Sequence, residues 1–279
     1  MVIYPLLFNV SNGVRQGGIL SPYLFNVYMD DLSVELNKCP YGCLVGGKSV
    51  NHLMYADDLV IFSPSSAGLA KWLDICSIYG NEHDIRYNSM KSAIVICRSR
   101  YNKHVTYDFS IDGDSITQVS SVKYLGHYIC ADFKDNIDIN RQCRQIYAQG
   151  NLLIRKFGNC SSDVKTFLFN TYCSSMYTAH LWWNYNVSSI KKLYVAYNNV
   201  FRFLHKLPRD CSASAMFVSN NVRNCSAILR NLVYRFTKRL AMSENSIIKL
   251  VLNSDLQWKS RIRKHWYKLL YSHNDFVMS

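Results

Sequence analysis

The hydrophobic pattern of the chain changes near residue 136, and this change restricts the chain to a fold with two different parts. Before it, short β-prone runs alternate with two helical patterns. After it, apolar residues recur at helical spacing in four long segments, residues 137–157, 163–183, 187–207 and 222–242. A mixed region followed by an all-helical region predicts the α+β class. We therefore expect a first domain at residues 1–135 and a helical domain at residues 136–279.

The charge is divided as unevenly as the hydrophobic pattern. The chain has a formal net charge of +13, but residues 1–140 sum to −3 and residues 141–279 to +16. In the basic half, Arg and Lys alternate with aromatic residues, a combination typical of nucleic-acid binding. A polyanionic partner and a solvated basic surface explain the charge alone equally well. For most of the single aromatic residues, a place in the helical core is the simpler interpretation.

Several protein classes are excluded or disfavoured by the sequence. No apolar run approaches the ~20 residues of a membrane span, so we expect no membrane partner. The first residues lack the basic region and cleavage site of a secretory signal. The ten cysteines are scattered without the spacing of a metal site, and we expect them to be reduced. The sequence thus favours an intracellular protein and leaves open whether it is nuclear or cytoplasmic.

A glycine-containing loop leads into the first predicted helix. Ser21 is expected as its N-cap and Pro22 as its first residue, because both types favour these positions. The helix includes a Tyr-x-Asp-Asp string. Successive helical residues point about 100° apart, so Asp30 and Asp31 cannot both address one site. We expect these two acids on the polar face of the helix.

A second Tyr-x-Asp-Asp string lies in a different setting. Two β-prone runs, residues 50–55 and 59–63, flank Ala56, Asp57 and Asp58 and predict a tight hairpin with two carboxylates at its tip. Adjacent carboxylates repel each other unless a cation offsets them. Enzymes that transfer nucleotidyl groups hold metal ions with such acids. Acidic pairs are common in solvated turns, but the flanking apolar strands favour a functional site here.

Further elements follow along the chain. A helix is expected from about Ser66 with Gly80 as its end, and residues 93–97 are expected to form a short buried strand. Asp112-Gly113 predicts another hairpin turn.

Four segments, in this order, resemble the motifs of reverse transcriptases. Residues 13–32 resemble motif B, Tyr55–Asp58 the catalytic motif C, Asn88–Ser92 motif D, and Val122–Gly126 motif E. Their order and spacing are similar to those of the LINE-like, jockey-type reverse transcriptases of non-LTR retrotransposons. The resemblance covers residues 10–130. It implies a partial polymerase palm of mixed helices and antiparallel strands, followed by an all-helical, thumb-like region.

The resemblance also implies roles for individual residues. Asp57 is expected as a metal ligand, Asp58 as its more peripheral neighbour, and Lys91 as the proton donor to the pyrophosphate leaving group. Mg²⁺ or Mn²⁺ is the implied cofactor. The implied partners are an RNA template, a DNA primer and deoxynucleoside triphosphates. Residues expected to contact nucleotide or template are Gln16, Gly17, Tyr55 and Ala56, and those expected to grip the primer are Tyr124, Leu125 and Gly126.

Some of these residues have a plain structural interpretation as well. Arg15 has no assigned role, and Gln16 taken alone is an ordinary polar residue of a loop. A solvated turn explains Lys91 almost as well as a catalytic role does. Tyr124 and Leu125 are expected to pack in a core whatever else they do.

The resemblance includes motifs B to E only. Motif A of the family supplies a further metal-binding Asp upstream of motif B, and no acidic residue precedes Asn12. We therefore expect the chain to be a C-terminal portion of a polymerase and to lack polymerase activity by itself. The alternative is a non-catalytic nucleic-acid-binding remnant that acts through its basic helical half. A third interpretation is a partly unfolded decay product without a role.

Overall fold

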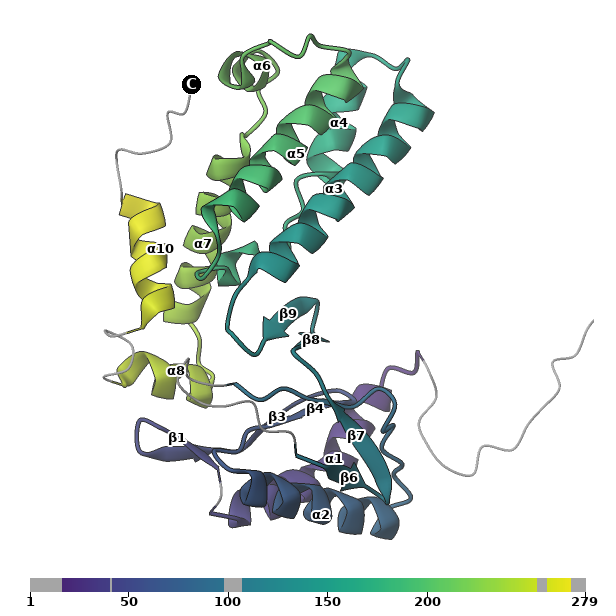
Figure 1. The fold of residues 1–279 in the computed structure, drawn as a ribbon, viewed down its shortest axis with the longest axis vertical. Coiled ribbons are helices and arrows are strands. Elements are labelled where there is room, and N and C mark those ends of the chain that lie inside the picture. The colour runs from purple at the N-terminus through teal and green to yellow at the C-terminus, as the bar shows by residue number, and fades with distance from the viewer. Residues whose placement is uncertain (1–16, 41, 98–106, 255–259, 272–279) are drawn as a thin grey trace, which may run out of the picture. The chain divides into compact units, whose positions relative to one another are not determined.

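A computed structural model describes residues 17–40, 42–97, 107–254 and 260–271 of the chain (Figure 1). Within these residues the fold is α+β, as predicted, and combines small, mostly antiparallel sheets with long helices. Contacts divide it into a first unit, residues 17–94 and 107–118, and a second unit, residues 95–97 and 119 onward. The second unit begins before its first long helix, residues 136–157, and therefore includes the short hairpin of residues 121–130.

The first unit contains two helices and seven short strands. Strand β1 pairs with β2, β3 with β4, and β7 lies between β5 and β6. The helices are α1 (Ser21–Lys38) and α2 (Ser66–Glu82), and the strands are β1 (Cys43–Val45), β2 (Lys48–Val50), β3 (His52–Tyr55), β4 (Asp58–Ile61), β5 (Ala93–Ile94), β6 (Phe109–Ile111) and β7 (Asp114–Gln118).

The core of the first unit lies between α1 and α2. Leu32 and Leu36 of α1 and Trp72 of α2 are fully buried, because the apolar residues of each helix recur on one face. The N-terminal half of α1 differs, since Tyr23 and Val27 are largely exposed. Helix α2 also packs against β6.

Two predicted helix boundaries are wrong. Leu20, without a side-chain cap, is the N-cap of α1, and Ser21 is already helical. Helix α2 continues past Gly80 to Glu82, so Gly80 does not end it. Gly80 instead marks a close approach, because a Cβ atom there would lie 2.8 Å from the carbonyl oxygen of Ile85.

The predicted turn at Asp112-Gly113 is confirmed. It joins β6 to β7, and both residues have a left-handed backbone, with φ of 52° and 83°. Such a backbone matches the twist of a two-residue hairpin, and Gly adopts it without strain. Strand β5 is shorter than predicted, because only Ala93 and Ile94 pair with β7.

The second unit is mostly helical. The predicted helices at residues 137–157, 187–207 and 222–242 are confirmed within a few residues. No helix in the described part of the chain is long and apolar enough to cross a membrane. The elements are β8 (Ser121–Tyr124), β9 (His127–Cys130), α3 (Asn136–Phe157), α4 (Ser162–Tyr172), α5 (Val187–His205), α6 (Ala213–Ser219), α7 (Cys225–Ala241), α8 (Ser246–Asn253) and α10 (Arg261–Tyr271).

The predicted helix at residues 163–183 is divided in the structure. Helix α4 ends at Tyr172, and only a short 3₁₀ turn, Ala179–Leu181, follows. The backbone N–H groups of Trp183 and Asn184 donate to the carboxylate of Asp135 at 2.8 and 2.7 Å. Asp135, the N-cap residue of α3, thus binds the backbone at the end of the predicted segment, whereas α4 itself already ends at Tyr172.

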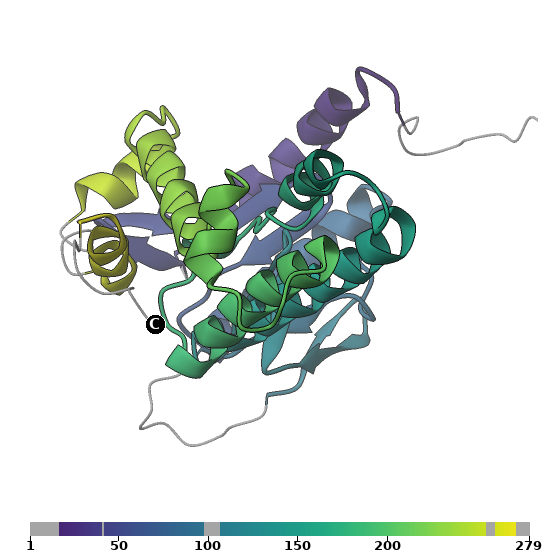
Figure 2. The same cartoon turned by 90° about the horizontal axis from the view of Figure 1, so that it is seen from above.

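Helices α3 and α5 lie side by side and form the centre of the helical core (Figures 1 and 2). Phe169 of α4 packs against them, with its ring centroid 4.8 Å from that of Tyr197 and 5.0 Å from that of Phe201. All three aromatic residues are fully buried. For Tyr197 and Phe201, the prediction of a core position is confirmed.

All ten cysteines of the chain are free thiols.

Gly150 allows the close approach of α3 and α5. A Cβ atom at this position would lie 2.4 Å from Cγ1 of Val200, a stiff, branched side chain. Helix propensity alone predicts that Gly150→Ala stabilises the protein by about 1 kcal/mol. We expect the opposite sign, a net loss of about 1–2 kcal/mol in the free energy of unfolding, because overpacking dominates. Urea titration measures it, and a stabilised variant would contradict the close packing.

Candidate functional site

The acidic hairpin predicted from the sequence is present. Strands β3 and β4 pair antiparallel, with Tyr55 opposite Asp58, so that Ala56 and Asp57 form a two-residue turn. Ala56 has a left-handed backbone with φ of 51°. Six other non-glycine residues of the described structure share this conformation. A left-handed residue is the usual geometry of a two-residue hairpin turn, so the backbone fixes a tight turn that presents both carboxylates at its tip.

The two carboxylates of this turn are open to solvent. Asp57 and Asp58 are exposed, and Tyr55 is 65% exposed. Carboxylate oxygens are the ligands that Mg²⁺ prefers. However, the described residues include no group of three or more His, Cys, Asp or Glu side chains that could hold a metal ion. The pair therefore fits as part of a metal site.

The other acidic pair lies apart from a turn, as predicted. Asp30 and Asp31 are exposed residues within α1. Of the loop before α1, Gly17 is described and has a left-handed backbone with φ of 78° and open space around its Cα. Arg15 and Gln16 lie outside the described residues.

The loop that carries Lys91 is organised around Asn88. The backbone N–H of Lys91 donates to the carbonyl oxygen and to Oδ1 of Asn88, both at 3.1 Å. Both the N–H and the hydroxyl of Ser92 donate to the same carbonyl at 2.9 Å. These bonds fix the backbone while the side chain of Lys91 stays exposed. No hydrogen bond or ion pair in the described structure joins Lys91 to Asp57 or Asp58.

The residues expected to grip the primer form a second tight hairpin. Tyr124 at the end of β8 pairs with His127 at the start of β9, and Leu125 and Gly126 form the turn with φ of 44° and 85°. A Cβ atom on Gly126 would lie 3.4 Å from the ring of Tyr177. Tyr124 is half-buried. The predicted core position of Leu125 is wrong, because the turn leaves this side chain 41% exposed.

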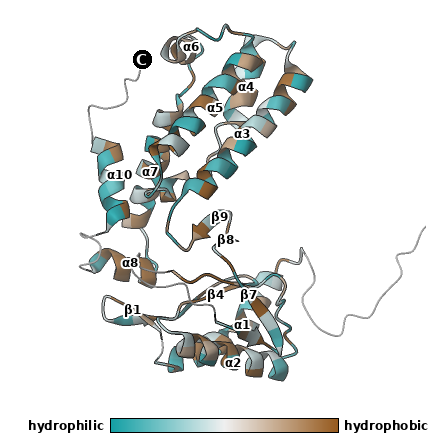
Figure 3. Cartoon of the chain, in the orientation of Figure 1, coloured by the Kyte–Doolittle hydropathy of each residue, from teal (hydrophilic) through white to brown (hydrophobic). Residues whose placement is uncertain are grey.

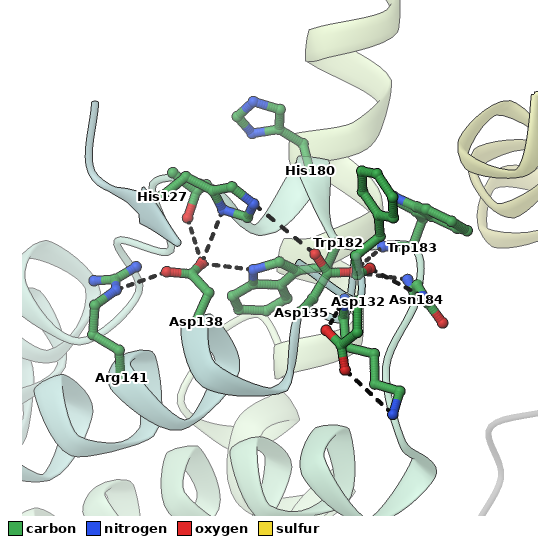
Figure 4. Close-up of polar contacts among 12 residues, drawn as sticks. His127, Asp132, Asp135, Asp138, Arg141, His180, Trp182, Trp183 and Asn184 are labelled. Atoms are coloured by element: carbon green, nitrogen blue, oxygen red, sulfur yellow. Dashed lines mark hydrogen bonds and ion pairs between the residues drawn. The ribbon is translucent and has the colours of Figure 1, made fainter. Parts of the chain in front are cut away.

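Beside this hairpin lies a buried polar cluster that sequence reasoning did not identify (Figure 4). Its centre is Asp138, in the first turn of α3, whose side chain is 0% exposed. Its Oδ2 accepts hydrogen bonds from Thr178 Oγ1 and Trp182 Nε1, both at 2.8 Å, and contacts His127 Nδ1 at 3.3 Å. Its Oδ1 accepts from Arg141 Nε at 2.8 Å. The indole of Trp182 is the one available signal in the sequence, since an indole N–H needs an acceptor when it is buried.

In this cluster the pKa values of Asp138 and of Asp135, the N-cap residue of α3, are shifted in opposite directions. Burial raises the pKa of Asp138, but the hydrogen bonds from His127, Arg141 and its other donors outweigh burial and hold that pKa well below the ordinary value. For Asp135, burial dominates and raises the pKa, although N–H donors from residues 183–184 oppose it. Asp138 is therefore a stable buried anion.

Helices α7 and α10 contact each other. Both contain hydrophilic stretches (Figure 3) and carry exposed Arg and Lys residues. Tyr234 and Tyr267 on these helices are 56% and 67% exposed. Trp266 of α10 packs instead against Phe236 of α7, with ring centroids 5.5 Å apart. Some aromatic residues thus join the helices, and others lie among the cations. We define the α7–α10 basic surface as the exposed residues Arg235, Lys238, Arg239, Arg261, Lys264 and Lys268.

Comparisons with known proteins match the first part of the chain. Residues 7–129 match the family described as "Reverse transcriptase (RNA-dependent DNA polymerase)". The chain is 34% identical over 130 residues to the "Retrovirus-related Pol polyprotein from type-2 retrotransposable element R2DM" of Drosophila melanogaster. The aligned residues make up 43% of this chain and 12% of that protein.

Similar proteins come from other insects. A Pol polyprotein from the type-1 retrotransposable element R2 of Popillia japonica is 29% identical over 124 residues, or 42% of this chain and 20% of that protein. Its counterpart from Nasonia vitripennis is 31% identical over 124 residues, or 42% of this chain and 12% of that protein. The matched segment thus spans 12% to 20% of the length of these curated relatives.

Proposed function

Because residues 7–129 carry a reverse-transcriptase segment of the non-LTR retrotransposon type, we propose that the chain is part of an RNA-directed DNA polymerase. The observation that carries the proposal is the tight, solvent-open turn between β3 and β4, which presents Asp57 and Asp58 inside the matched segment. The substrates in the intact enzyme are a DNA primer on an RNA template and deoxynucleoside triphosphates. The assignment to the jockey type within this class stays a prediction.

The remaining predicted roles are part of the same proposal. Tyr55 and Ala56 stand at the acidic turn, where an incoming nucleotide would meet the carboxylates. Lys91 projects from a fixed backbone and supplies the proton to the pyrophosphate. Tyr124, Leu125 and Gly126 contact the primer strand, which the exposure of this second turn permits. Gln16 and Gly17 contact template and nucleotide.

We further propose that the chain alone does not hold two divalent ions. Reverse transcriptases use Mg²⁺ or Mn²⁺, and a two-ion centre needs several carboxylates around both ions. Asp57 and Asp58 supply oxygen ligands, but no third candidate ligand joins them in the described part of the chain. A further carboxylate, in the position of motif A, is required to complete the site.

Primer extension tests this proposal directly. We expect no extension of a DNA primer on an RNA template by this chain in Mg²⁺ or Mn²⁺, because the ligand set for two ions is incomplete. Asp57→Ala is the diagnostic variant, and Asp30→Ala is the matched control from the helical acidic pair. Robust extension that Asp57→Ala abolishes and Asp30→Ala preserves would contradict the proposed inactivity.

The second candidate function is nucleic-acid binding without catalysis. The α7–α10 basic surface favours it, because cations that neutralise phosphates are interspersed there with exposed tyrosines that can stack on bases. A binder of this kind grips the backbone without reading sequence. It is expected to hold a primer–template duplex even where no extension occurs.

A further inference from the structure

The β8–β9 hairpin depends on support from outside its own strands. In the described structure these two strands pair only with each other. A two-stranded hairpin is marginally stable in water by itself. Its turn, Leu125-Gly126, is immediately followed by His127, which points toward helix α3 (Figure 4). The residue next to the turn therefore connects the hairpin to the start of α3.

His127 lies between two acidic residues at the start of α3. Its Nδ1 is 3.3 Å from Oδ2 of Asp138, and its Nε2 is 3.9 Å from Oδ1 of Asp135. The side chain of His127 is 16% exposed, whereas that of Asp138 is 0% exposed. The contact is thus shielded from solvent, and screening by salt weakens it little.

Asp138 cannot easily turn away from this contact. Thr178, Trp182 and Arg141 each donate a hydrogen bond of 2.8 Å to its carboxylate. A buried anion is a costly way to stabilise a fold, and an apolar side chain of similar volume often serves as well. Unlike an apolar side chain, the carboxylate orients each side chain that donates a hydrogen bond to it.

A purely structural role explains only part of this arrangement. A carboxylate in the first turn of α3 interacts favourably with the helix dipole and stabilises the helix. The hydrogen bonds from Thr178 and Trp182 connect the segment after α4 to α3. Neither explains the contact from His127, which comes from the hairpin. Other titratable groups near His127 in the described structure include Asp135, the N-cap residue of α3, and His180, whose pKa is lowered mainly by burial and further by Arg239 and His127. Arg141 of α3 binds the carboxylate of Asp138 that His127 contacts.

We propose that Asp138 is a positioning residue that sets, through His127, the place of the Leu125-Gly126 turn on the helical unit. The effect on the primer rests on the proposed function, in which this turn contacts the primer strand. The placement of the hairpin itself does not rest on it. The two parts are therefore tested by different measurements.

Hydrogen exchange of the full chain tests the placement. His127→Phe keeps a ring of similar size and removes the contact from the hairpin. Thr178→Val is the matched control, because it removes a donor to the same Asp138 oxygen from the helical side and preserves volume. We expect His127→Phe to speed exchange of the amides of residues 121–130 by about tenfold, the effect of losing a hydrogen bond to an ionised group.

Exchange in the Thr178→Val control and in helix α5 of the core distinguishes a local effect from a general loss of stability. Exchange within α5 is expected to stay unchanged in both variants, and the hairpin is expected to stay protected in Thr178→Val. An unchanged hairpin in His127→Phe would overturn the proposal. An equal rise of hairpin exchange in both variants would overturn it too, because it would show a general loss of stability.

Binding of a primer–template duplex separates this inference from the proposed function. We expect His127→Phe to weaken the affinity several-fold and Thr178→Val to leave it unchanged. A wild-type chain that binds no duplex would contradict the proposed function, while the exchange result would still decide the placement. Faster hairpin exchange with full affinity would support the placement and overturn the assignment of this turn to the primer.

Discussion

Asp138→Asn is expected to lower the free energy of unfolding of the helical unit by about 3–5 kcal/mol. The amide keeps the shape of the side chain but replaces an oxygen by an NH₂ group, which then faces N–H or O–H donors. Asp138 is fully buried, and its two oxygens face four donors, from His127, Arg141, Thr178 and Trp182. The variant removes the charge that all four stabilise. Denaturant titration followed by tryptophan fluorescence measures the loss.

Asp163→Asn provides the matched control, because it makes the same change in the first turn of α4 at an exposed position. Its expected cost is only about 0.3–1 kcal/mol, the value of a dipole interaction. Equal losses in both variants would contradict the importance of the buried cluster.

The pH dependence of stability is a second test of the contribution of Asp138. The pKa of Asp138 is lowered in the fold, so its contribution is complete above the ordinary value of 3.8 and declines as the pH falls below it. Asp135 acts in the opposite direction, since its pKa is raised in the fold. We expect the wild type to lose more stability than Asp138→Asn on acidification below about pH 4.

Duplex binding by the helical unit is expected to fall about 10³-fold between about 50 and about 200 mM salt if about six phosphates are contacted. Each neutralised phosphate releases counterions, so the logarithm of affinity declines linearly with the logarithm of salt. The double variant Arg235→Gln, Lys238→Gln on the α7–α10 basic surface is expected to lower the slope by about 0.9 for each lost contact. Fluorescence anisotropy of a labelled duplex over a salt series measures both.

The control for this prediction removes the same charge elsewhere. Lys48 and Arg86 are exposed in the first unit, and their replacement by Gln is expected to leave the slope unchanged. A slope that responds equally to both double variants would point to binding by net charge alone. A wild-type affinity that does not depend on salt would contradict a phosphate-gripping surface.

Periodicity predicted much of the fold because the long helices bury one continuous stripe. In α3 and α5 the apolar residues recur every three or four positions, and Ile146 and Leu193 at these positions are buried. The hairpin turns at Asp57 and Asp112 were predictable from local residue types between β-prone runs. For the candidate site, local sequence was therefore sufficient to place the acidic turn.

Long-range hydrogen bonds account for what the sequence did not predict. The helix expected over residues 163–183 ends at Tyr172, and Trp183 and Asn184 instead donate their backbone N–H groups to Asp135, almost 50 positions earlier in the chain. Asp138 likewise depends on Trp182 and Thr178, which are distant in sequence. Period and composition contain no information about such pairs. The exposure of Leu125 has a local cause instead, the left-handed backbone of the turn.

The free thiols of the helical unit make selective chemical labelling practicable. Burial raises the pKa of Cys173 to about 12 and also raises the pKa of Cys143 and Cys225, which keeps these sulfur atoms protonated and slow to react. Cys160, between α3 and α4, is exposed. In the same unit Cys97 is exposed as well, and Cys211 is partly exposed, so within this unit a maleimide dye is directed to Cys160 once these two residues are replaced by Ser.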